Sequence, residues 1–289
     1  MRLYLALTLI AILTINNPAF ASDEVEKAIL DKATTNLKHY GFTPLETAVN
    51  INSGTFNPQG VQEVSKYYAG ELEKLGFKHW TVDLSKVERG EHLFAEYKGK
   101  NSKKTLLLIG HMDTVFEKNS PFQKFEVVDD EYIRGPGIAD MKGGNTVILE
   151  SLKAIKQAGA LEDISVIVAL IGDEENLGLD KDGSSTTTRG DVIELAKQSD
   201  YALSFEPALT HSYNKLVIAR RGFMGWTMKA ETKSGHSSRV LREKLGAGAI
   251  YALNRVLTNI YDYASKQKNL TINPGIFTGG TSVTYDSEA

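Results

Sequence analysis

Apolar residues recur at helical spacing in three long segments of the chain and form short continuous runs in several others. A period of three to four residues that ends at a glycine indicates an amphipathic helix, whereas a short apolar run between turn residues indicates a buried strand. The pattern predicts helices over residues 23–41, 58–76 and 143–159. It predicts strands over residues 94–97, 105–109, 165–171 and 201–205.

Helices and strands therefore alternate along the first part of the chain. This alternation is typical of an α/β fold with a mostly parallel, buried sheet. The polar stretch "LDKDGSSTTTRGD" (179–191) is rich in turn residues and is expected to be a loop.

The pattern changes after residue 216, where apolar and polar residues alternate over 217–234 as in a half-exposed antiparallel strand. A helix is predicted over residues 246–266, and a further pair of strands is predicted to begin at residue 270. These elements predict a second, smaller α+β domain over 218–289 that is opened but not completed, after a first domain over 22–217.

Residues 1–21 have the features of a secretory signal peptide. One arginine precedes an apolar run, and Ala19-Phe20-Ala21 forms a small-x-small cleavage pattern. The alternative is a membrane anchor, but the run is shorter than the roughly 20 residues that a span needs. We therefore expect a periplasmic or secreted protein with no membrane attachment after cleavage.

Composition narrows the possible partners and site chemistry. The 289 residues are 42% hydrophobic and 24% charged, and the net charge of −3 comes from interspersed acids and bases. No basic stripe is present, so nucleic acid is not an expected partner. The sequence contains no cysteine, so a metal site must use His, Asp and Glu.

Three predicted strands end in residues that can bind a metal or transfer a proton: His111, Asp113, Glu174, Glu175 and Glu206. Ligands of open α/β sheets bind at the carboxyl ends of strands, so these side chains are expected to converge in one crevice. A fourth segment, the glycine-rich turn "RGPGIADMKGGN", places Asp140 just before a predicted helix.

One histidine with several carboxylates favours a divalent cation, with zinc as the leading candidate and manganese or cobalt as alternatives. Two ions bridged by one carboxylate would compensate so many acids. The alternatives are a surface turn for His111 and Asp113, and a helix N-cap for Asp140. Asp173 is expected to be an orienting or capping residue, because neighbouring residues of a strand point to opposite sides. Four histidines are interpreted as ordinary surface or core residues: His39, His79, His92 and His211.

The segments "GHMDTV", "GPGIADMKGG", "GDEE" and "DYALSFEP" together resemble the co-catalytic zinc metallopeptidase family. That family includes bacterial glutamate carboxypeptidase, which is the most similar member, aminoacylase and succinyl-diaminopimelate desuccinylase. The resemblance implies a zinc-exopeptidase-type mixed sheet flanked by helices, with an inserted α+β lid that also dimerises. It implies a hydrolase that releases an amino acid from a peptide or an N-acyl amino acid.

The resemblance also assigns roles to individual residues. It implies that His111 and Glu206 hold one zinc ion, that Glu175 holds the other, and that Asp140 bridges the two. Asp113 would orient His111, and Glu174 would be the general base. The peptide bond between Asp140 and Met141 would be cis.

In the lid, the resemblance places His236 at a substrate-binding position that reaches the partner subunit's site. Alternatively, His236 is an ordinary solvent-exposed histidine in a loop. The resemblance further requires a zinc-ligating histidine beyond the lid, and no histidine follows His236 in this sequence. We therefore expect the lid to be incomplete, and the 289-residue chain to bind nearer one zinc ion than two and to lack activity. The alternative function is a truncated, non-catalytic binding or dimerising module with partial metal binding.

Overall fold

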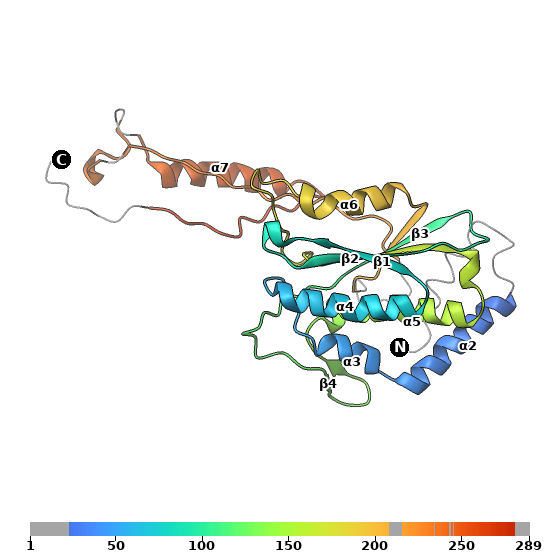
Figure 1. Cartoon of the computed structure of the whole chain (residues 1–289). Coiled ribbons are helices and arrows are strands. Elements are labelled where there is room, and N and C mark those ends of the chain that lie inside the picture. Colours follow the sequence, from blue (N-terminus) through green and yellow to red (C-terminus); the bar gives the residue numbers. More distant parts are fainter. Residues whose placement is uncertain (1–22, 208–215, 234, 243, 245, 281–289) are drawn as a thin grey trace. The chain divides into compact units, whose positions relative to one another are not determined.

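The computed structural model describes residues 23–207, 216–233, 235–242, 244 and 246–280 (Figure 1). The predicted signal peptide and His211 lie outside these residues. The chain divides into two compact units, Met1–Lys215 and Leu216–Ala289. Among the described residues, no helix combines the length and the apolar character needed to cross a membrane.

A five-stranded sheet in the order β1-β2-β6-β3-β7 is the centre of the first unit. Its strands are β1 (Lys78–Asp83), β2 (Glu91–Tyr97), β3 (Thr105–His111), β6 (Ser165–Ile171) and β7 (Tyr201–Ser204). The pairs β3–β6 and β3–β7 are parallel, whereas β1–β2 and β2–β6 are antiparallel. The sheet is therefore mixed, as the resemblance implies. Strand β2 runs opposite to the other four strands, so the two pairs at the β1–β2 edge are antiparallel and only the β6–β3–β7 part is parallel, as the apolar runs predict.

Helices cover both faces of the sheet (Figure 1). Helices α4 (Pro58–Lys74) and α5 (Gly143–Gln157) lie on one face, with α2 (Asp23–Tyr40) packed against α5, and α3 (Thr43–Val49) lies near them. Helix α6 (Thr186–Lys197) lies on the other face.

Strand β6 shows why both faces are buried. Val166, Val168 and Leu170 contribute to the larger hydrophobic core that helices α2, α4 and α5 complete. The alternate residues Ile167 and Ala169 join a smaller core, against which side chains of α6 pack. A strand covered on both sides has no polar face, which explains its continuous apolar run.

Several elements of the first unit were not predicted. They are α3, the edge strand β1, helix α6, the two-residue strands β4 (Glu126–Val127) and β5 (Ile133–Arg134), and the short turns η1 (Ser85–Val87) and η3 (Leu161–Asp163). Helix α6 begins inside the predicted loop 179–191. It was not predicted because its first turn of threonines has weak helix propensity and gives no apolar period. Strand β1 is mostly exposed, so it also lacks the apolar run of a buried strand.

The second unit contains α7 (Ala249–Ala264) and the short turn η5 (Ser237–Arg239). Helix α7 falls within the predicted segment 246–266. The strands predicted over 217–234 and from 270 are not formed in the described part of this unit, where the backbone is irregular. A strand requires a neighbour to accept its backbone hydrogen bonds, and the described residues of this unit supply none.

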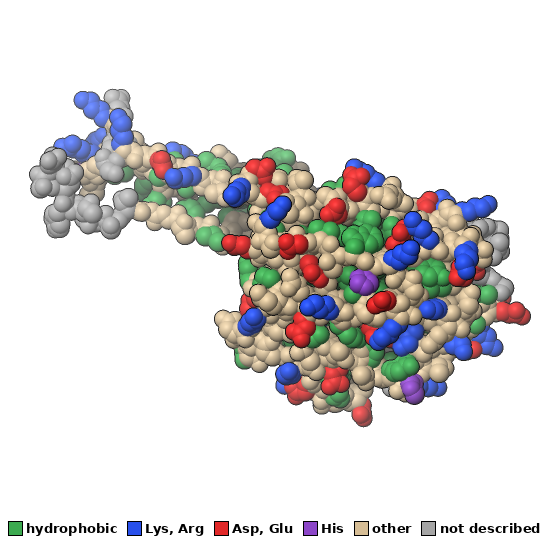
Figure 2. All heavy atoms as spheres, in the orientation of Figure 1, with side chains coloured by type: hydrophobic (Ala, Val, Ile, Leu, Met, Phe, Trp, Pro, Cys, Tyr) green, Lys and Arg blue, Asp and Glu red, His purple; other side chains and the backbone are tan. Residues whose placement is uncertain are grey.

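The surface of the first unit carries charges of both signs. On the face shown in Figure 2, lysine and arginine side chains are intermixed with aspartate and glutamate side chains. This face has no patch of a single sign, as the interspersed charges of the sequence predict.

Candidate metal centre and active site

His111 is the last residue of β3, at the carboxyl end of the sheet. Its side chain is buried, with 1% exposed. The ring nitrogen Nδ1 donates to the backbone oxygen of Asp113 at 3.0 Å. Asn145 on α5 donates its amide to the backbone oxygen of His111 at 2.6 Å. These contacts fix the ring so that Nε2 is the atom available to a ligand.

Asp140 lies in η2 (Ile138–Lys142), the kinked turn that leads into α5. Its backbone leaves helical geometry, with φ −131° and ψ 98°, and the Asp140–Met141 peptide bond is cis, as the resemblance implies. Lys142, which follows Met141, is fully buried and donates to the backbone oxygens of Ala48 and Ile51 at 3.0 and 2.7 Å. These bonds join the turn to the end of α3.

Glu206 follows β7 and is brought towards η2 by a close backbone approach. A Cβ atom added to Gly144 would lie 2.2 Å from the backbone oxygen of Phe205, so only glycine allows this contact. The first turn of α5 therefore packs directly against the segment that carries Glu206.

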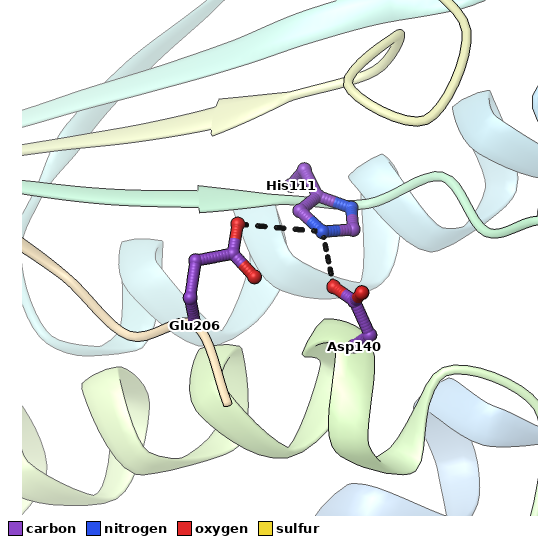
Figure 3. A group of neighbouring side chains, drawn as sticks. All are labelled: His111, Asp140 and Glu206. Carbon is purple, nitrogen blue, oxygen red and sulfur yellow. Dashed lines mark hydrogen bonds and ion pairs between the residues drawn. The ribbon is translucent and has the colours of Figure 1, made fainter. Parts of the chain in front are cut away.

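The side chains of His111, Asp140 and Glu206 meet at one point (Figure 3). His111 Nε2 lies 2.8 Å from Asp140 Oδ1 and 3.7 Å from Glu206 Oε1. One ligand atom from each residue falls within 4.8 Å of the others. One nitrogen and two carboxylate oxygens at this separation form a suitable set of protein ligands for a divalent cation.

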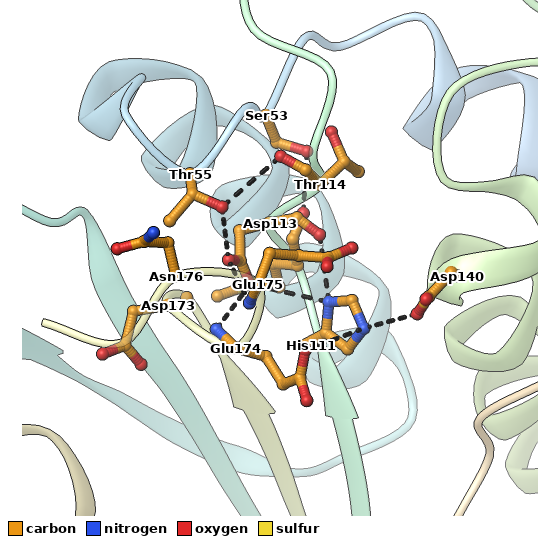
Figure 4. A network of polar contacts seen from close by, with 12 residues as sticks. Ser53, Thr55, His111, Asp113, Thr114, Asp140, Asp173, Glu174, Glu175 and Asn176 are labelled. Atoms are coloured by element: carbon orange, nitrogen blue, oxygen red, sulfur yellow. Dashed lines mark hydrogen bonds and ion pairs between the residues drawn. The ribbon is translucent and has the colours of Figure 1, made fainter. Parts of the chain in front are cut away.

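Glu174 and Glu175 lie beside this triad in the turn after β6 (Figure 4). Asp113, fully buried, holds that turn through its carboxylate. Its Oδ1 accepts from the backbone N–H of Glu174, and its Oδ2 accepts from that of Glu175, both at 3.0 Å. Oδ2 also accepts from the Thr55 hydroxyl at 2.8 Å. Asp113 thus positions two predicted site residues through their backbone.

Burial and neighbouring charges shift the pKa values of the side chains at this centre. Burial raises the pKa of Glu175 to about 7, with the charge of Asp140 adding to the shift. Burial likewise raises the pKa of Glu206 to about 6. Burial by itself lowers the pKa of His111, but Asp113, Asp140 and Glu206 outweigh it and raise this pKa to about 10. A divalent cation would favour the ionised acids and the neutral imidazole.

The structure thus brings together all the predicted residues of the first unit. Glu174 Oε2 lies 4.0 Å from His111 Nε2, and the carboxylate of Asp113 lies 3.5 Å from Nδ1 of the same ring. Asp113 therefore contacts His111 mainly through its backbone oxygen, whereas its carboxylate holds the Glu174–Glu175 turn. His236 belongs to the second unit, where its Nδ1 accepts from the backbone N–H of Ser238 at 3.3 Å, and its role stays a prediction.

Sequence reasoning missed the residues that hold the site from outside. They include Thr55, Lys142 and Asn145, which make the hydrogen bonds described above, and Arg89 and Arg189, which contact the turn that carries Glu174. Lys142 and Asn145 lie in the same glycine-rich stretch as Asp140, but neither is a residue type that suggests a metal ligand. Thr55, Arg89 and Arg189 stand in no pattern with the metal ligands, because they come from other segments of the chain.

Comparisons with known proteins agree with this geometry. The family profile described as peptidase family M20/M25/M40 matches residues 107–285. Carboxypeptidase G2 of Pseudomonas sp. (strain RS-16) is 33% identical over 252 residues, which are 85% of this chain and 56% of that protein. Acetylornithine deacetylase of Aliivibrio fischeri (strain MJ11) is 27% identical, over 75% of this chain and 53% of its own.

The chain therefore spans about half the length of these curated relatives. Among solved structures, the di-peptidase Dug1p from Saccharomyces cerevisiae has a TM-score of 0.51 at 19% identity, covering 64% of this chain and 41% of that one. This likeness shows a shared fold. The profile match covers most of the chain, and the chain belongs to peptidase family M20/M25/M40.

Proposed function

We propose that the protein that carries this chain is a metal-dependent hydrolase of amide bonds. It acts as an exopeptidase, similar to a carboxypeptidase, and releases an amino acid from a peptide or from an N-acyl amino acid. The observation that carries this proposal is the convergence of His111, Asp140 and Glu206, with Glu174 beside them. The names of the relatives, a carboxypeptidase and a deacetylase, support the same class of reaction.

Zinc is the proposed metal, with two ions in the full-length protein. The triad would hold one ion, Glu175 would hold the other, and Asp140 would bridge them. The donor set supports this assignment, because it offers nitrogen and oxygen but no thiolate. Such ions, when bound, polarise a scissile carbonyl and make water nucleophilic at neutral pH.

Glu174 is the proposed general base. Its carboxylate borders the triad, with Oε2 4.0 Å from His111 Nε2, and its backbone is fixed by Asp113. In this role Glu174 accepts a proton from the attacking water and donates it to the leaving amine. Glu175 is less exposed than Glu174, and burial raises its pKa, so a cation beside it would favour its ionised form.

The remaining parts of the proposal concern the whole protein. The second unit acts as a lid and dimerisation domain, and His236 binds substrate, which has a free carboxylate. Export to the periplasm or the medium follows from the N-terminal pattern of the sequence.

The proposal is tested by Glu174→Gln in the full-length, zinc-loaded protein, assayed on dipeptides and N-acyl amino acids. We expect zinc content to stay near that of the unsubstituted protein, while kcat falls by about 10²-fold to 10⁴-fold, as for other general bases. A near-normal kcat would remove Glu174 from the mechanism. Hydrolysis should also stop when the substrate's C-terminus is amidated, and equal cleavage of free and amidated peptides would exclude the exopeptidase.

A further inference from the structure

The turn from Gly172 to Gly178 carries both Glu174 and Glu175, and it packs tightly at both ends. A Cβ atom on Gly172 would lie 2.1 Å from the backbone oxygen of Glu91, and one on Gly178 would lie 2.6 Å from the Val87 side chain. Each end of the turn therefore lies directly against the segment of this chain that contains Val87 and Glu91. What holds the turn between these ends determines where the two glutamates point.

Asp173 holds the turn from the side opposite to the metal centre. Its side chain is fully buried and points away from His111 (Figure 4). One carboxylate oxygen accepts from Arg189 Nη1 at 2.6 Å, and the other accepts from the backbone N–H of Gly178 at 2.9 Å. Arg189 Nη2 reaches the backbone oxygen of Asp173 at 3.4 Å. The guanidinium thus binds both the side chain and the backbone of Asp173.

Arg189 lies on α6, and His92, from β2, connects that helix to the start of the turn. Its Nδ1 accepts from the backbone N–H of Gly172 at 3.1 Å, and its Nε2 donates to the backbone oxygen of Thr188 at 2.7 Å. Burial lowers the pKa of His92, which keeps the ring neutral as these two bonds require. Thr188 immediately precedes Arg189, so the first turns of α6 are tied to the turn at two points.

We propose that Arg189 is a positioning residue for the general base: through buried Asp173 it holds the Gly172–Gly178 turn so that Glu174 and Glu175 face the metal ligands. This inference rests on the proposed function for its catalytic consequence. It gives a function to the polar segment 179–191, whose end carries Arg189.

The arrangement explains why two acidic groups hold one turn from opposite sides. Asp113 accepts the N–H groups of Glu174 and Glu175 on the side of the metal ligands. Asp173 is anchored on the other side by Arg189, which has 27% of its side chain exposed. Without Arg189, the Asp173 carboxylate would be buried without its cation, and the turn would have to shift to bring it to water.

The test compares Arg189→Met, Arg189→Lys and the double variant Arg189→Met/Asp173→Asn. Lys197→Met is the matched control, because Lys197 lies on the same helix and forms an exposed ion pair with Glu194 at 2.6 Å. The first measurement is hydrogen–deuterium exchange of peptides spanning 172–178 in the purified 289-residue chain, which requires no activity. The second is kcat and KM of the full-length, zinc-loaded protein.

We expect Arg189→Met to speed exchange in residues 172–178 by at least about tenfold, as expected for a segment that opens locally. It should lower kcat by about 10²-fold, as a misplacement of about 1 Å does, and leave KM within about threefold. The exchange rate and kcat of Arg189→Lys should lie between those of the unsubstituted protein and those of Arg189→Met, because lysine keeps the charge but cannot bind both the side chain and the backbone of Asp173. The double variant should regain thermal stability, since no charge is left unpaired, without regaining kcat.

Exchange and kcat of Arg189→Met equal to those of Lys197→Met would overturn the proposal. Recovery of kcat in the double variant would also overturn it, because Arg189 would then only neutralise a buried charge. If the unsubstituted full-length protein is inactive with zinc, the proposed function fails. The exchange measurement then still decides whether Arg189 positions the turn.

Discussion

Replacing Asp113 with asparagine should destabilise the first unit although the two side chains have nearly the same shape. Both carboxylate oxygens of Asp113 accept hydrogen bonds: Oδ1 from the Glu174 N–H, and Oδ2 from the Glu175 N–H and the Thr55 hydroxyl. In either orientation, the new amide group of asparagine would face at least one backbone N–H. That N–H would be left without an acceptor in a buried site.

The magnitude follows from the bonds that are lost. Hydrogen bonds to a charged group contribute about 1.5–3 kcal/mol each, and an unsatisfied buried donor costs about 1–3 kcal/mol. Removing a buried charge offsets part of this loss. We expect the free energy of unfolding to fall by about 2–3 kcal/mol near pH 7. Thr55→Val removes the hydroxyl, which donates to Asp113 and also lies 3.4 Å from the Thr114 backbone oxygen, and should cost about 1 kcal/mol.

The pH dependence gives an independent check. Burial acts to raise the pKa of Asp113, but His111, Thr55 and the Glu174 N–H outweigh it and hold this pKa below its ordinary value. A carboxyl whose pKa is lower in the folded state stabilises above its unfolded pKa, about 3.9, and this contribution is lost as the pH falls through the folded value. The difference between Asp113 and Asp113→Asn should therefore shrink in acid.

Urea unfolding of the metal-free chain, followed by tryptophan fluorescence, measures both effects, because Trp80 lies in β1 of the first unit. Asp163→Asn is the matched control, since Asp163 accepts an exposed hydrogen bond from the Asn101 side-chain amide. The control should stay within about 0.5 kcal/mol of the unsubstituted chain. An equally small effect of Asp113→Asn near pH 7 would refute the reasoning.

Two further predictions concern metal binding. Zinc binding near pH 7 should release at least about one proton, because the pKa of about 10 leaves metal-free His111 protonated. Glu206, with a pKa of about 6, adds about a tenth of a proton, and Glu175, with a pKa of about 7, adds up to about half a proton. Calorimetry in buffers of different ionisation enthalpy measures this release, and zinc binding without proton release would contradict it. Gly144→Ala should weaken zinc binding by about tenfold or more, because its Cβ would displace Phe205 and hence Glu206. Gly70→Ala in α4, where no atom outside the helix's own backbone lies within 4 Å of the added Cβ, should leave zinc affinity unchanged in the same titration.

The strands that carry the metal ligands could be predicted from the sequence because their apolar pattern is local. Strand β6 occupies the predicted residues 165–171, and β3 extends the predicted strand by two residues to His111. The convergence of strand ends could also be anticipated, since parallel strands deliver their carboxyl ends to one edge.

The supporting contacts could not be predicted, because they depend on how distant segments pack. Asp113 contacts the backbone of residues about 60 positions away, and a backbone N–H gives no signal in the sequence. His92 was interpreted as an ordinary histidine, and it is indeed buried, but its two backbone partners come from the turn after β6 and from α6. The strands predicted over 217–234 and from 270 are not formed in the described residues of the second unit, because a local pattern does not provide a pairing partner.

Metal binding by His111, Asp140 and Glu206 can be observed by anomalous X-ray diffraction from zinc-soaked crystals of the chain, with data above and below the zinc edge. We expect an anomalous peak about 2.0–2.2 Å from His111 Nε2 and from one carboxylate oxygen of each acid. A map without a peak at these three atoms, or with zinc held only by other residues, would contradict it.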